Sequence, residues 1–471
     1  MIMTEVLKNS PQFIRIPFEL IYNKLPESFR YSREYLRNYY ETYDLLNKSQ
    51  WWSKEELETY QMEQLKKIVK HAYDTVPYYH KLFDEYGIYV KDIKSLDDIK
   101  KIPYLTKDII HNNLEDLISN KYRKNKIIYA VTGGSTGIPM GLYQYKDYEY
   151  ARESAFIRFL YDKIGYKDGE KALVLRGNII KSINEKMNIF FEINYGRNEL
   201  VASSFHLSEK NLKYYIRAIK KFKPVCIKAY PSSLYLLARY IKKEKIDDFD
   251  FIKYIILASE NINTTQNKLF QELFKHARIF SFYGHTEHAC IAGACEVSDY
   301  YHIQSEYGYT ELINSNDKYV EKEDEIGEIV ATGFNNYVMP LIRYATADLA
   351  VNTNKSCKCG RNYKLIKRLE GRKQEFLIDR NNEIITFTNH DETLWDVKDK
   401  MSAYQYIQNK PGSVTLNIQP KEKLSQSEEY EVKKNFKKYY PNIEIEIAFV
   451  KHIRRTKRGK FKYLIQNVKA I

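Results

Sequence analysis

Residues 126–139 read Lys126-Ile127-Ile128-Tyr129-Ala130-Val131-Thr132-Gly133-Gly134-Ser135-Thr136-Gly137-Ile138-Pro139, and this stretch decides the fold class. Its first six residues form a short apolar run rich in β-branched side chains, which predicts a strand. The strand leads directly into three glycines, one serine and two threonines. Such a loop can surround phosphate oxygens with its backbone N–H groups and hydroxyls, although a plain flexible turn has the same composition. It is not a Walker loop, because no lysine follows the last glycine.

Strand-like and helical segments alternate on the C-terminal side of this loop. Helices are predicted at Leu212–Lys221 and Ser232–Lys243, and a longer helical region precedes the loop at 54–95, broken at Val76-Pro77-Tyr78. Alternation of this kind predicts an α/β layered domain with a mostly parallel sheet. The predicted strands are Ala172–Leu175, Val225–Lys228, Tyr254–Leu257 and Arg278–Phe282.

The last third of the chain changes character. Residues 300–351 are β-rich, and from Phe376 onward a smaller α+β unit is predicted, with strands in EIITF, SVTLNIQ and IEIEIAFV and a helix in SEEYEVKKNFKKYY. Glycine permits unusual backbone angles, so Gly371-Arg372 is the predicted joint. We therefore expect a large domain over residues 1–368 and a small, mobile one over 372–471.

Composition excludes several classes of protein. The 471 residues carry 75 basic and 61 acidic side chains, a net charge of +14, yet the lysines are interspersed with glutamates and no nucleic-acid module is present. No apolar run is long enough to span a membrane, and the N-terminus does not resemble a secretory signal, so we expect a cytoplasmic protein. The basic surface could attract nucleotides, acidic glycans or an anionic membrane face, or simply be solvated.

The first 50 residues and the Trp51-Trp52 pair contain aromatic side chains that either dock on a membrane or a partner, or pack into the core. Peripheral membrane association and a homodimer are both left open by the sequence. Five cysteines are too few for a disulfide scaffold in a chain of this length, so reduced thiols or a metal site are expected.

Five short motifs, in order, resemble those of the adenylate-forming superfamily, which includes acyl-CoA synthetases, peptide-synthetase adenylation domains and luciferases. Each motif is a weak signal alone, but their common order over most of the chain is specific. They are TGGSTGIP at 132–139, similar to TSGSTGxP; YGHTE at 283–287, similar to YGxTE; RYATADL at 343–349, similar to RYxTGDL; GR at 371–372; and RTKRGK at 455–460, similar to RTxxGK.

The closer resemblance is to the phenylacetate–CoA ligase family, and within it to the capsular-polysaccharide CapK-like branch. It extends from about residue 60 to the C-terminus. It rests on HAY at 71–73, VPYY at 76–79, PYLTK at 103–107, AYPSSL at 229–234 and CKCGR at 357–361.

This resemblance implies ATP as cofactor and a magnesium ion held by Glu287. ATP brings about four negative charges, and carboxylate and phosphate oxygens are the ligands that Mg²⁺ prefers. Tyr283 is then expected against the adenine and Asp348 on the ribose hydroxyls. The remaining nucleotide-binding residues are expected to be Thr132, Gly133, Gly134, Ser135, Thr136, Gly137, Gly284, His285 and Arg372, with Arg343 either facing a phosphate or bracing a strand.

The resemblance also implies a reaction. A small carboxylic acid would attack the α-phosphate of ATP to give acyl-AMP and pyrophosphate, and the acyl group would pass to an amine, hydroxyl or thiol. Lys460 resembles the mobile C-terminal lysine that bridges the two repelling anions, with Thr286 and Glu287 in the catalytic centre. The alternative for Lys460 is a solvated residue in a basic run. A hinge at Gly371-Arg372 would move the small domain between the two half-reactions.

Two departures from the superfamily pattern bear on the acceptor. Ala347 stands where a glycine normally precedes the motif aspartate, and the hinge reads GRKQEF, without the acidic pair typical of CoA ligases. The second departure weakens the case for CoA and favours the CapK-like branch. An aryl–CoA ligase stays an alternative, as does a retired ligase fold that acts as a glycan-assembly factor.

Further residues are candidates for substrate and metal binding. Tyr230, Pro231 and Ser232 are expected to shape the acid pocket by resemblance, and His206 and His288 could line the acyl or acceptor pocket or only support it. Three cysteines and a histidine make a closed tetrahedral zinc set, and related ligases with this pattern imply a structural zinc. The predicted ligands are Cys295, His302, Cys357 and Cys359, with Cys290 as an alternative and Cys226 as a packing residue.

Overall fold

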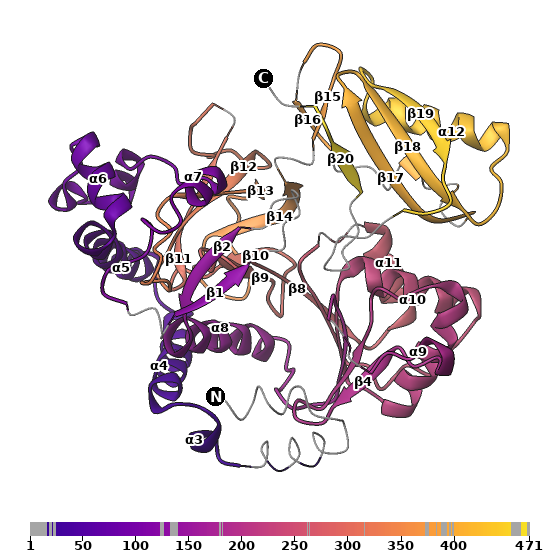
Figure 1. Ribbon diagram of the computed structural model, residues 1–471, viewed down its shortest axis with the longest axis horizontal. Helices are drawn as coiled ribbons and strands as arrows, with labels where there is room; N and C mark the ends of the chain where they lie inside the picture. The colour runs from indigo at the N-terminus through magenta and orange to yellow at the C-terminus, as the bar shows by residue number, and fades with distance from the viewer. Residues whose placement is uncertain are drawn as a thin grey trace.

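The computed structural model consists of a large domain and a smaller C-terminal domain (Figure 1). The structure describes residues 17, 21, 25–122, 127–131, 140–178, 180, 182–260, 262, 264–314, 316–372, 376–382, 384–387, 393–394, 397, 400–453 and 463–468. None of the described helices is both long and apolar enough to cross a bilayer.

The N-terminal part is helical, which confirms the helical prediction within residues 54–95, whereas the two described helices before residue 50 were not predicted. Ser53 caps the longest helix, α5, and forms a reciprocal capping box with Glu56. The break predicted at Val76-Pro77 is confirmed, because Val76 ends α5 and Pro77 is the first residue of α6. The helices are α3 (Glu27–Arg30), α4 (Arg33–Ser49), α5 (Lys54–Thr75), α6 (Pro77–Tyr86) and α7 (Lys107–Asn112), with short 3₁₀ turns at Val90–Asp92 and Leu96–Lys101.

The strand that opens the glycine-rich loop is β1 (Ile127–Val131), close to the predicted limits. It pairs antiparallel with β2 (Gly141–Tyr145) in a separate two-stranded sheet. A single π-helical turn (Lys146–Tyr150) then leads into α8 (Ala151–Asp162). The loop itself, Thr132–Pro139, lies outside the described residues.

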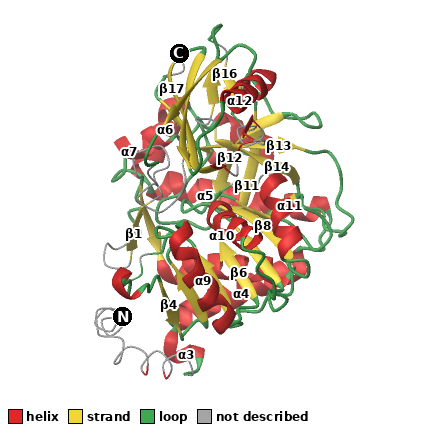
Figure 2. Cartoon of the chain, turned by 90° about the vertical axis from the view of Figure 1, so that its right-hand side faces the viewer, coloured by secondary structure: helices red, strands yellow, loops and turns green. Residues whose placement is uncertain are grey.

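Twelve strands form the main sheet of the large domain, in the order β11-β12-β13-β14-β10-β9-β8-β7-β6-β3-β5-β4. Strands β5, β3, β6, β7 and the first half of β8 are mutually parallel. Helices α9 (Glu209–Phe222), α10 (Pro231–Lys243) and α11 (Thr264–Leu273) cover one face of these strands (Figure 2), and α8 packs against the other. The parallel part comprises β3 (Ala172–Leu175), β5 (Glu199–Ala202), β6 (Cys226–Ala229), β7 (Tyr254–Leu257) and β8 (Arg278–Gly284), with β4 (Phe191–Asn194) antiparallel at the edge.

β8 is where the sheet changes from parallel to antiparallel. Residues 278–281 pair with β7, whereas Phe282–Gly284 pair antiparallel with β9. The expectation of a mostly parallel sheet is correct for β3 and β5 to β8 but wrong for the whole sheet, because the strands after β8 have no crossover helices among the described residues between them and all pair antiparallel. These strands are β9 (Ile291–Gly293), β10 (Tyr301–Ile303), β11 (Gly308–Ile313), β12 (Ile326–Gly333), β13 (Tyr344–Asn352) and β14 (Leu365–Arg372).

The C-terminal domain is a four-stranded sheet in the order β19-β18-β17-β20, with α12 packed on it and a small β15–β16 hairpin beside it. The predicted segments EIITF, SVTLNIQ, IEIEIAFV and SEEYEVKKNFKKYY match β16, β18, β19 and α12, whereas β17 was not predicted. The elements are β15 (Phe376–Ile378), β16 (Ile384–Thr386), β17 (Met401–Lys410), β18 (Ser413–Pro420), α12 (Gln426–Tyr439), β19 (Glu444–Phe449) and β20 (Leu464–Gln466).

The joint between the domains lies at the end of β14. Gly371 and Arg372 pair with Leu349 and Asp348 of β13, so the large sheet continues four residues past the boundary set at 368. Gly371 has a φ of 101°, an angle that only glycine adopts readily. The two domains also touch elsewhere, because an Arg239 Nη1 of α10 donates to the Met401 carbonyl at 3.3 Å.

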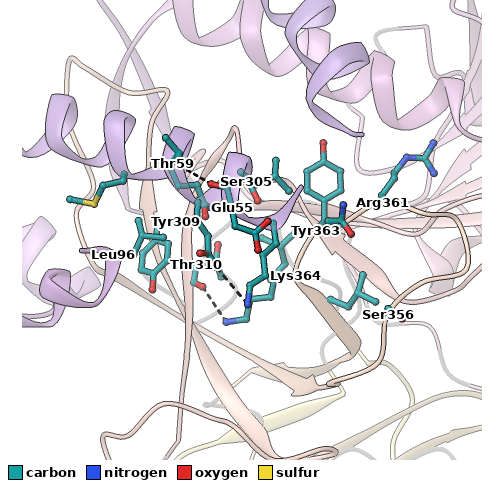
Figure 3. Close-up of a pocket in the computed structure, with 18 of the residues that line it drawn as sticks. Glu55, Thr59, Leu96, Ser305, Tyr309, Thr310, Ser356, Arg361, Tyr363 and Lys364 are labelled. Atoms are coloured by element: carbon teal, nitrogen blue, oxygen red, sulfur yellow. Dashed lines mark hydrogen bonds and ion pairs between the residues drawn. The ribbon is translucent and has the colours of Figure 1, made fainter. Parts of the chain in front are cut away.

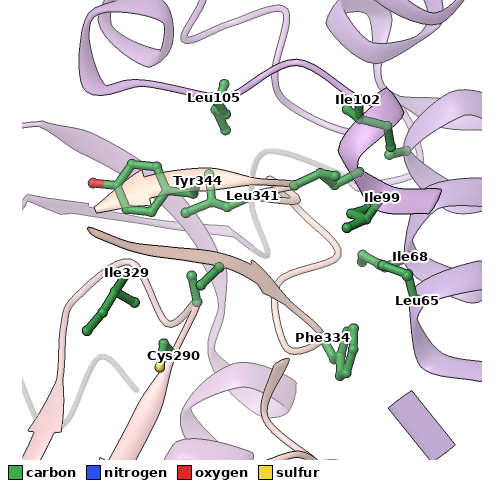
Figure 4. Packing of buried hydrophobic residues seen from close by; sticks show 14 of the residues in the cluster. Leu65, Ile68, Ile99, Ile102, Leu105, Cys290, Ile329, Phe334, Leu341 and Tyr344 are labelled. Atoms are coloured by element: carbon green, nitrogen blue, oxygen red, sulfur yellow. The ribbon is translucent and has the colours of Figure 1, made fainter. Parts of the chain in front are cut away.

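The largest apolar core joins α5 to the antiparallel strands. Figure 4 shows Leu65 and Ile68 of α5 facing Ile99 and Ile102, with Tyr344 and Leu341 packed nearby. Tyr344 is fully buried, and its hydroxyl lies at the edge of this core, where it hydrogen-bonds to Glu287. The core therefore fixes the position of one residue on which the candidate site depends.

Candidate active site

The segment Tyr283–Glu287 runs out of β8 at the point where the sheet changes direction. The Tyr283 hydroxyl donates a hydrogen bond of 2.8 Å to Asp348 Oδ2, which joins the second and third motifs directly. The Tyr283 ring is buried and stands edge-on to the His285 ring, with centroids 5.6 Å apart. Burial, reinforced by Asp348, holds the pKa of Tyr283 well above its usual value, so the phenol keeps its proton.

Glu287 is held from both sides. Its Oε1 accepts a hydrogen bond of 2.9 Å from the Tyr344 hydroxyl, and its Oε2 lies 3.3 Å from His285 Nδ1. Burial alone would raise the pKa of the Glu287 carboxyl, but His285 and, more weakly, Lys107 lower it to about 2. The result is a buried carboxylate that stays ionised, which is the chemistry expected of a ligand for a divalent cation.

Arg343 braces the fold. Its guanidinium forms a buried ion pair with Glu311 at 3.0 Å and donates to the carbonyls of Lys100 and Ile102. It also lies over the Tyr104 ring, 4.2 Å from the centroid. Of the two roles the sequence left open for Arg343, this geometry favours the structural one.

The hairpin that carries the glycine-rich loop is tied to the YGHTE segment by one side chain. Gln144 of β2 donates from Nε2 to the Thr286 carbonyl at 2.9 Å, and the same atom lies 3.3 Å from His288 Nδ1. His288 also lies 3.9 Å from the buried Glu149 carboxylate and has a φ of 51°. His288 thus contacts Gln144 and Glu149, the first of which also holds the YGHTE segment in place.

Residues predicted to bind the acid lie at the carboxyl ends of the parallel strands. Tyr230 and Pro231 follow β6 and open α10, and Ser232 is held by Glu260, which accepts from its N–H at 2.9 Å and from its hydroxyl at 3.1 Å. His206 follows β5, 2.8 Å from the Ser203 hydroxyl. In open α/β sheets, ligands bind at this edge.

The structure therefore brings together part of the predicted site. Tyr283, His285, Glu287 and Asp348 form one connected group, and Thr286 and Gly284 lie in the same segment. Thr132, Gly133, Gly134, Ser135, Thr136, Gly137 and Lys460 lie outside the described residues, and of Arg372 only the backbone is described.

Several residues of this site were missed by sequence reasoning. Tyr344 and Lys107 approach Glu287, Gln144 contacts Thr286, and Ser259-Glu260 follows β7 between Tyr230 and Tyr283. Ser259 has a φ of 70°, which the sequence does not reveal. Lys107 and Tyr344 lie in the PYLTK and RYATADL motifs, which is the sequence signal that points to them, whereas Gln144 carries no local signal.

The four predicted zinc ligands converge. Their ligand atoms all lie within 4.8 Å of one another, with Cys295 Sγ 3.6 Å from Cys357 Sγ and Cys359 Sγ 3.3 Å from His302 Nε2. A tetrahedral zinc ion with Zn–S near 2.3 Å and Zn–N near 2.0 Å would separate two sulfurs by about 3.8 Å and a sulfur and a nitrogen by about 3.5 Å. The donor set fits zinc in both chemistry and spacing.

The other two cysteines lie elsewhere. Cys290, the alternative ligand, accepts from the Thr310 hydroxyl at 3.4 Å and is not part of the cluster. Cys226 is fully buried in β6, as predicted for a packing residue.

A separate groove of about 1130 Å³ runs between α5 and the strands around β11. Figure 3 shows Glu55 and Thr59 of α5 facing Tyr309, Thr310 and Lys364 across it. Among the predicted site residues that the structure describes, only Cys357 lines it. The groove is therefore distinct from the group around Glu287.

Comparisons with known proteins identify relatives of this chain. Residues 377–467 match the family model of the CapK C-terminal domain. The chain is 27% identical over 448 residues to the protein CapK of Staphylococcus aureus, covering 93% of this chain and 94% of the relative. It is 24% identical over 376 residues to a phenylacetate-coenzyme A ligase of Thermus thermophilus, covering 77% and 80%.

Solved structures match the fold at lower identity. A 2-hydroxyisobutyryl-CoA ligase in the postadenylation state, in complex with R3-HIB-AMP, superposes with a TM-score of 0.69 at 16% identity, covering 88% of this chain and 90% of that one. The same ligase in its thioesterification state gives 0.57 at 16% identity, covering 88% and 91%. The chain is therefore similar in sequence to CapK and to phenylacetate-coenzyme A ligases, and its fold is that of the adenylate-forming ligases.

Proposed function

We propose that the protein activates a small carboxylic acid with ATP as an acyl-adenylate and transfers the acyl group to an acceptor during the synthesis of a capsular or other surface polysaccharide. The observation that carries the proposal is the connected group of Tyr283, Asp348, His285 and Glu287. The capsular context is supported by the likeness to CapK. Amide or ester formation on a sugar is the expected outcome.

Each residue then has a role that follows from its chemistry. Asp348, accepting from Tyr283, presents a carboxylate to the ribose hydroxyls, and the Tyr283 ring borders the adenine. Ionised Glu287 would hold a magnesium ion, which when bound neutralises charge on the phosphates. Ser135, Thr136 and Gly137 would bind the phosphates, and Lys460 would approach both anions as they react.

ATP–pyrophosphate exchange over a panel of carboxylic acids tests this proposal. Exchange is expected with at least one acid and should fall by two orders of magnitude or more in Glu287→Gln, since roughly that factor is lost with one electrostatic group. Glu311→Gln is unsuitable as a control because it unpairs Arg343. Glu85→Gln on the exposed side of α6 is suitable and should retain full exchange. If the protein binds ATP but none of the acids supports ATP–pyrophosphate exchange, the result would indicate a ligase fold that has lost its catalytic activity.

The acceptor decides between two versions of the reaction. The second candidate is thioester formation with CoA, favoured by the sequence relatives named as phenylacetate-coenzyme A ligases. Loss of free thiol from CoA, measured after exchange has identified the acid, separates the two. CoA consumption that depends on acid and ATP would establish the second candidate, and release of AMP only on addition of an amine or sugar would exclude it.

We also propose that Cys295, His302, Cys357 and Cys359 hold one structural zinc ion. This ion would cross-link the β9–β10 region to the loop before β14, with the His302 Nδ1 directed at the Tyr300 carbonyl, 3.2 Å away. Elemental analysis should find one zinc per chain. Cys357→Ser should lose it and lower the melting temperature, whereas Cys290→Ser, a buried thiol outside the cluster, should keep the metal.

A further inference from the structure

The carboxyl end of β3 is followed by a half-buried cation, Arg176, that the proposed reaction does not use. Arg176 directly follows this strand, and its Nε and Nη2 atoms are buried without a hydrogen-bond partner among the described residues. The guanidinium does have neutral neighbours, because the Tyr161 phenol is within hydrogen-bonding reach of it and the Cys226 thiol interacts with it electrostatically. Burial raises the pKa of both, so they are neutral and cannot balance the charge of the guanidinium.

Arg176 lies next to the segment expected to bind the acid. Leu175 is in register with Ala229, and the Tyr230 N–H donates to the Leu175 carbonyl at 3.2 Å. Arg176 and Tyr230 are therefore neighbours across two adjacent parallel strands. Because side chains alternate along a strand, both are on the same face of the sheet, the one covered by α8.

The same face carries an apolar cluster directly before Arg176. Val174 and Val201 are in register and pack with Ile180 into a small group of buried side chains. A cation at the strand ends thus stands above an apolar surface. This combination suits a small molecule with a hydrocarbon body and an anionic end, at the sheet edge where ligands bind.

An anion beside Arg176 would satisfy the two buried nitrogen atoms, Nε and Nη2. A buried charge without a partner costs several kcal/mol, so proteins almost always pair it. The Nε and Nη2 atoms form one edge of the guanidinium, and such an edge binds a carboxylate or phosphate through two parallel hydrogen bonds. The requirement can be met by a ligand that arrives with its own negative charge.

We propose that the acid activated by this protein carries a second anionic group, a carboxylate or a phosphate, that pairs with Arg176 while the first carboxylate reacts. The inference rests on the proposed function and narrows its substrate class to dianionic acids. The other source of such an anion is ATP itself. In that case Arg176 would bind ATP, and its effect would be the same whichever acid is activated.

Matched acids test the proposal by ATP–pyrophosphate exchange. Succinate is compared with butyrate and isophthalate with benzoate, and the dianionic member of a pair should have the higher kcat/KM. In Arg176→Gln the preference should fall roughly ten- to a hundredfold, the usual effect of losing a charged hydrogen-bond pair, while exchange with the monoanionic member persists. Arg217→Gln, on the exposed side of α9, is the matched control and should leave the preference unchanged.

Calorimetric binding of succinate and isophthalate separates this inference from the proposed function, because it needs no turnover. Binding lost in Arg176→Gln supports the inference even if no acid is activated. Equal use of both members of each pair, or a preference unaffected by Arg176→Gln, would overturn it while leaving acid activation intact. An increased KM for ATP with all acids would assign Arg176 to the nucleotide instead. The melting temperature of free Arg176→Gln should not fall, since the variant removes an unpaired charge, and a large fall would point to a structural role.

Discussion

At the scale of single residues, Ala347 stands where the superfamily pattern has a glycine, and its backbone is strained. Ala347 has a φ of 64°, in the left-handed region that favours glycine, and its N–H donates to Glu328 Oε1 at 3.0 Å. The backbone there is fixed by the bulged pairing that presents Asp348. A glycine adopts this backbone angle without strain, which explains the glycine at this position in the superfamily pattern.

Ala347→Gly should accordingly stabilise the protein by about 1 kcal/mol, because relief of the left-handed strain exceeds the entropy that glycine adds to the unfolded chain. Urea unfolding measures the change. Ala345→Gly, two residues earlier in β13 with no positive φ, should instead destabilise it by about 0.5–1 kcal/mol. Destabilisation by both variants would show that the conformation of Ala347 is not strained.

A second residue-scale prediction concerns the Glu149 and His288 pair. Burial raises the pKa of Glu149 from 4.5 to about 7. Burial alone would lower the pKa of His288, but the nearby carboxylates, Glu153 and Glu149 foremost, have the larger combined effect and raise it. Both folded-state values exceed the unfolded ones, so the folded chain binds more protons, and the stability from this pair declines as the pH rises.

The free energy of unfolding of the wild type, relative to Glu149→Gln, should therefore fall by on the order of 1–3 kcal/mol between pH 5 and pH 8. Urea titrations at half-unit pH intervals give this difference. Glu85→Gln, which lies far along the chain on the exposed side of α6, should show no such trend. If the free energy of unfolding of the wild type, relative to Glu149→Gln, instead rises with pH, both groups of the pair are ionised in the folded protein.

At the scale of elements, the structure assigns a role to the N-terminal helix that the sequence left open. α4 packs along α8, and Leu46 is fully buried there beside Phe156. Ser49 at its end hydrogen-bonds to Glu306, which also accepts from the Tyr363 hydroxyl at 2.8 Å. The helix belongs to the core of the large domain, whereas Trp51 just after it is exposed and most of residues 16–26 lie outside the described residues.

Leu46→Ala should destabilise the protein by about 2–5 kcal/mol, the range for a leucine truncated in a packed core. Lys48→Ala, exposed in the same helix, should change the stability by less than about 0.5 kcal/mol. Chemical unfolding followed by tryptophan fluorescence provides both values. If Leu46→Ala has no effect, α4 does not contribute to the core.

At the scale of the whole molecule, we propose that the end of β14 is a hinge between the two domains. Gly371 holds a φ of 101° while paired to Leu349, so a side chain there would restrict the backbone angles available to the joint. Domain movement between half-reactions would need this residue to change its angles.

Gly371→Ala should therefore lower the rate of complete acyl transfer several-fold while reducing ATP–pyrophosphate exchange less. Gly169→Ala is the matched control, because Gly169 has a φ of 87° with open space around it and lies far from the joint. That control should lose a similar amount of stability and keep the transfer rate. Equal losses of both half-reactions in Gly371→Ala would argue against a hinge.

The amino-acid sequence alone determined the local elements and the motifs. Apolar periodicity placed α5, α9, α10, β3 and β7 close to their observed limits, because helices and strands bury one face of a repeating pattern. Three cysteines and His302 are a tetrahedral zinc donor set, which predicted a cluster, and the fold brings their ligand atoms within 4.8 Å of one another.

Only the tertiary structure decided how distant segments meet. The mixed sheet arises at β8, one half of which pairs with β7 and the other with β9, and no local pattern reveals such a division. Gln144 reaches Thr286, and Tyr344 reaches Glu287, across more than fifty residues of chain. Contacts of this kind depend on strand register and on packing between elements, which short-range propensities do not encode.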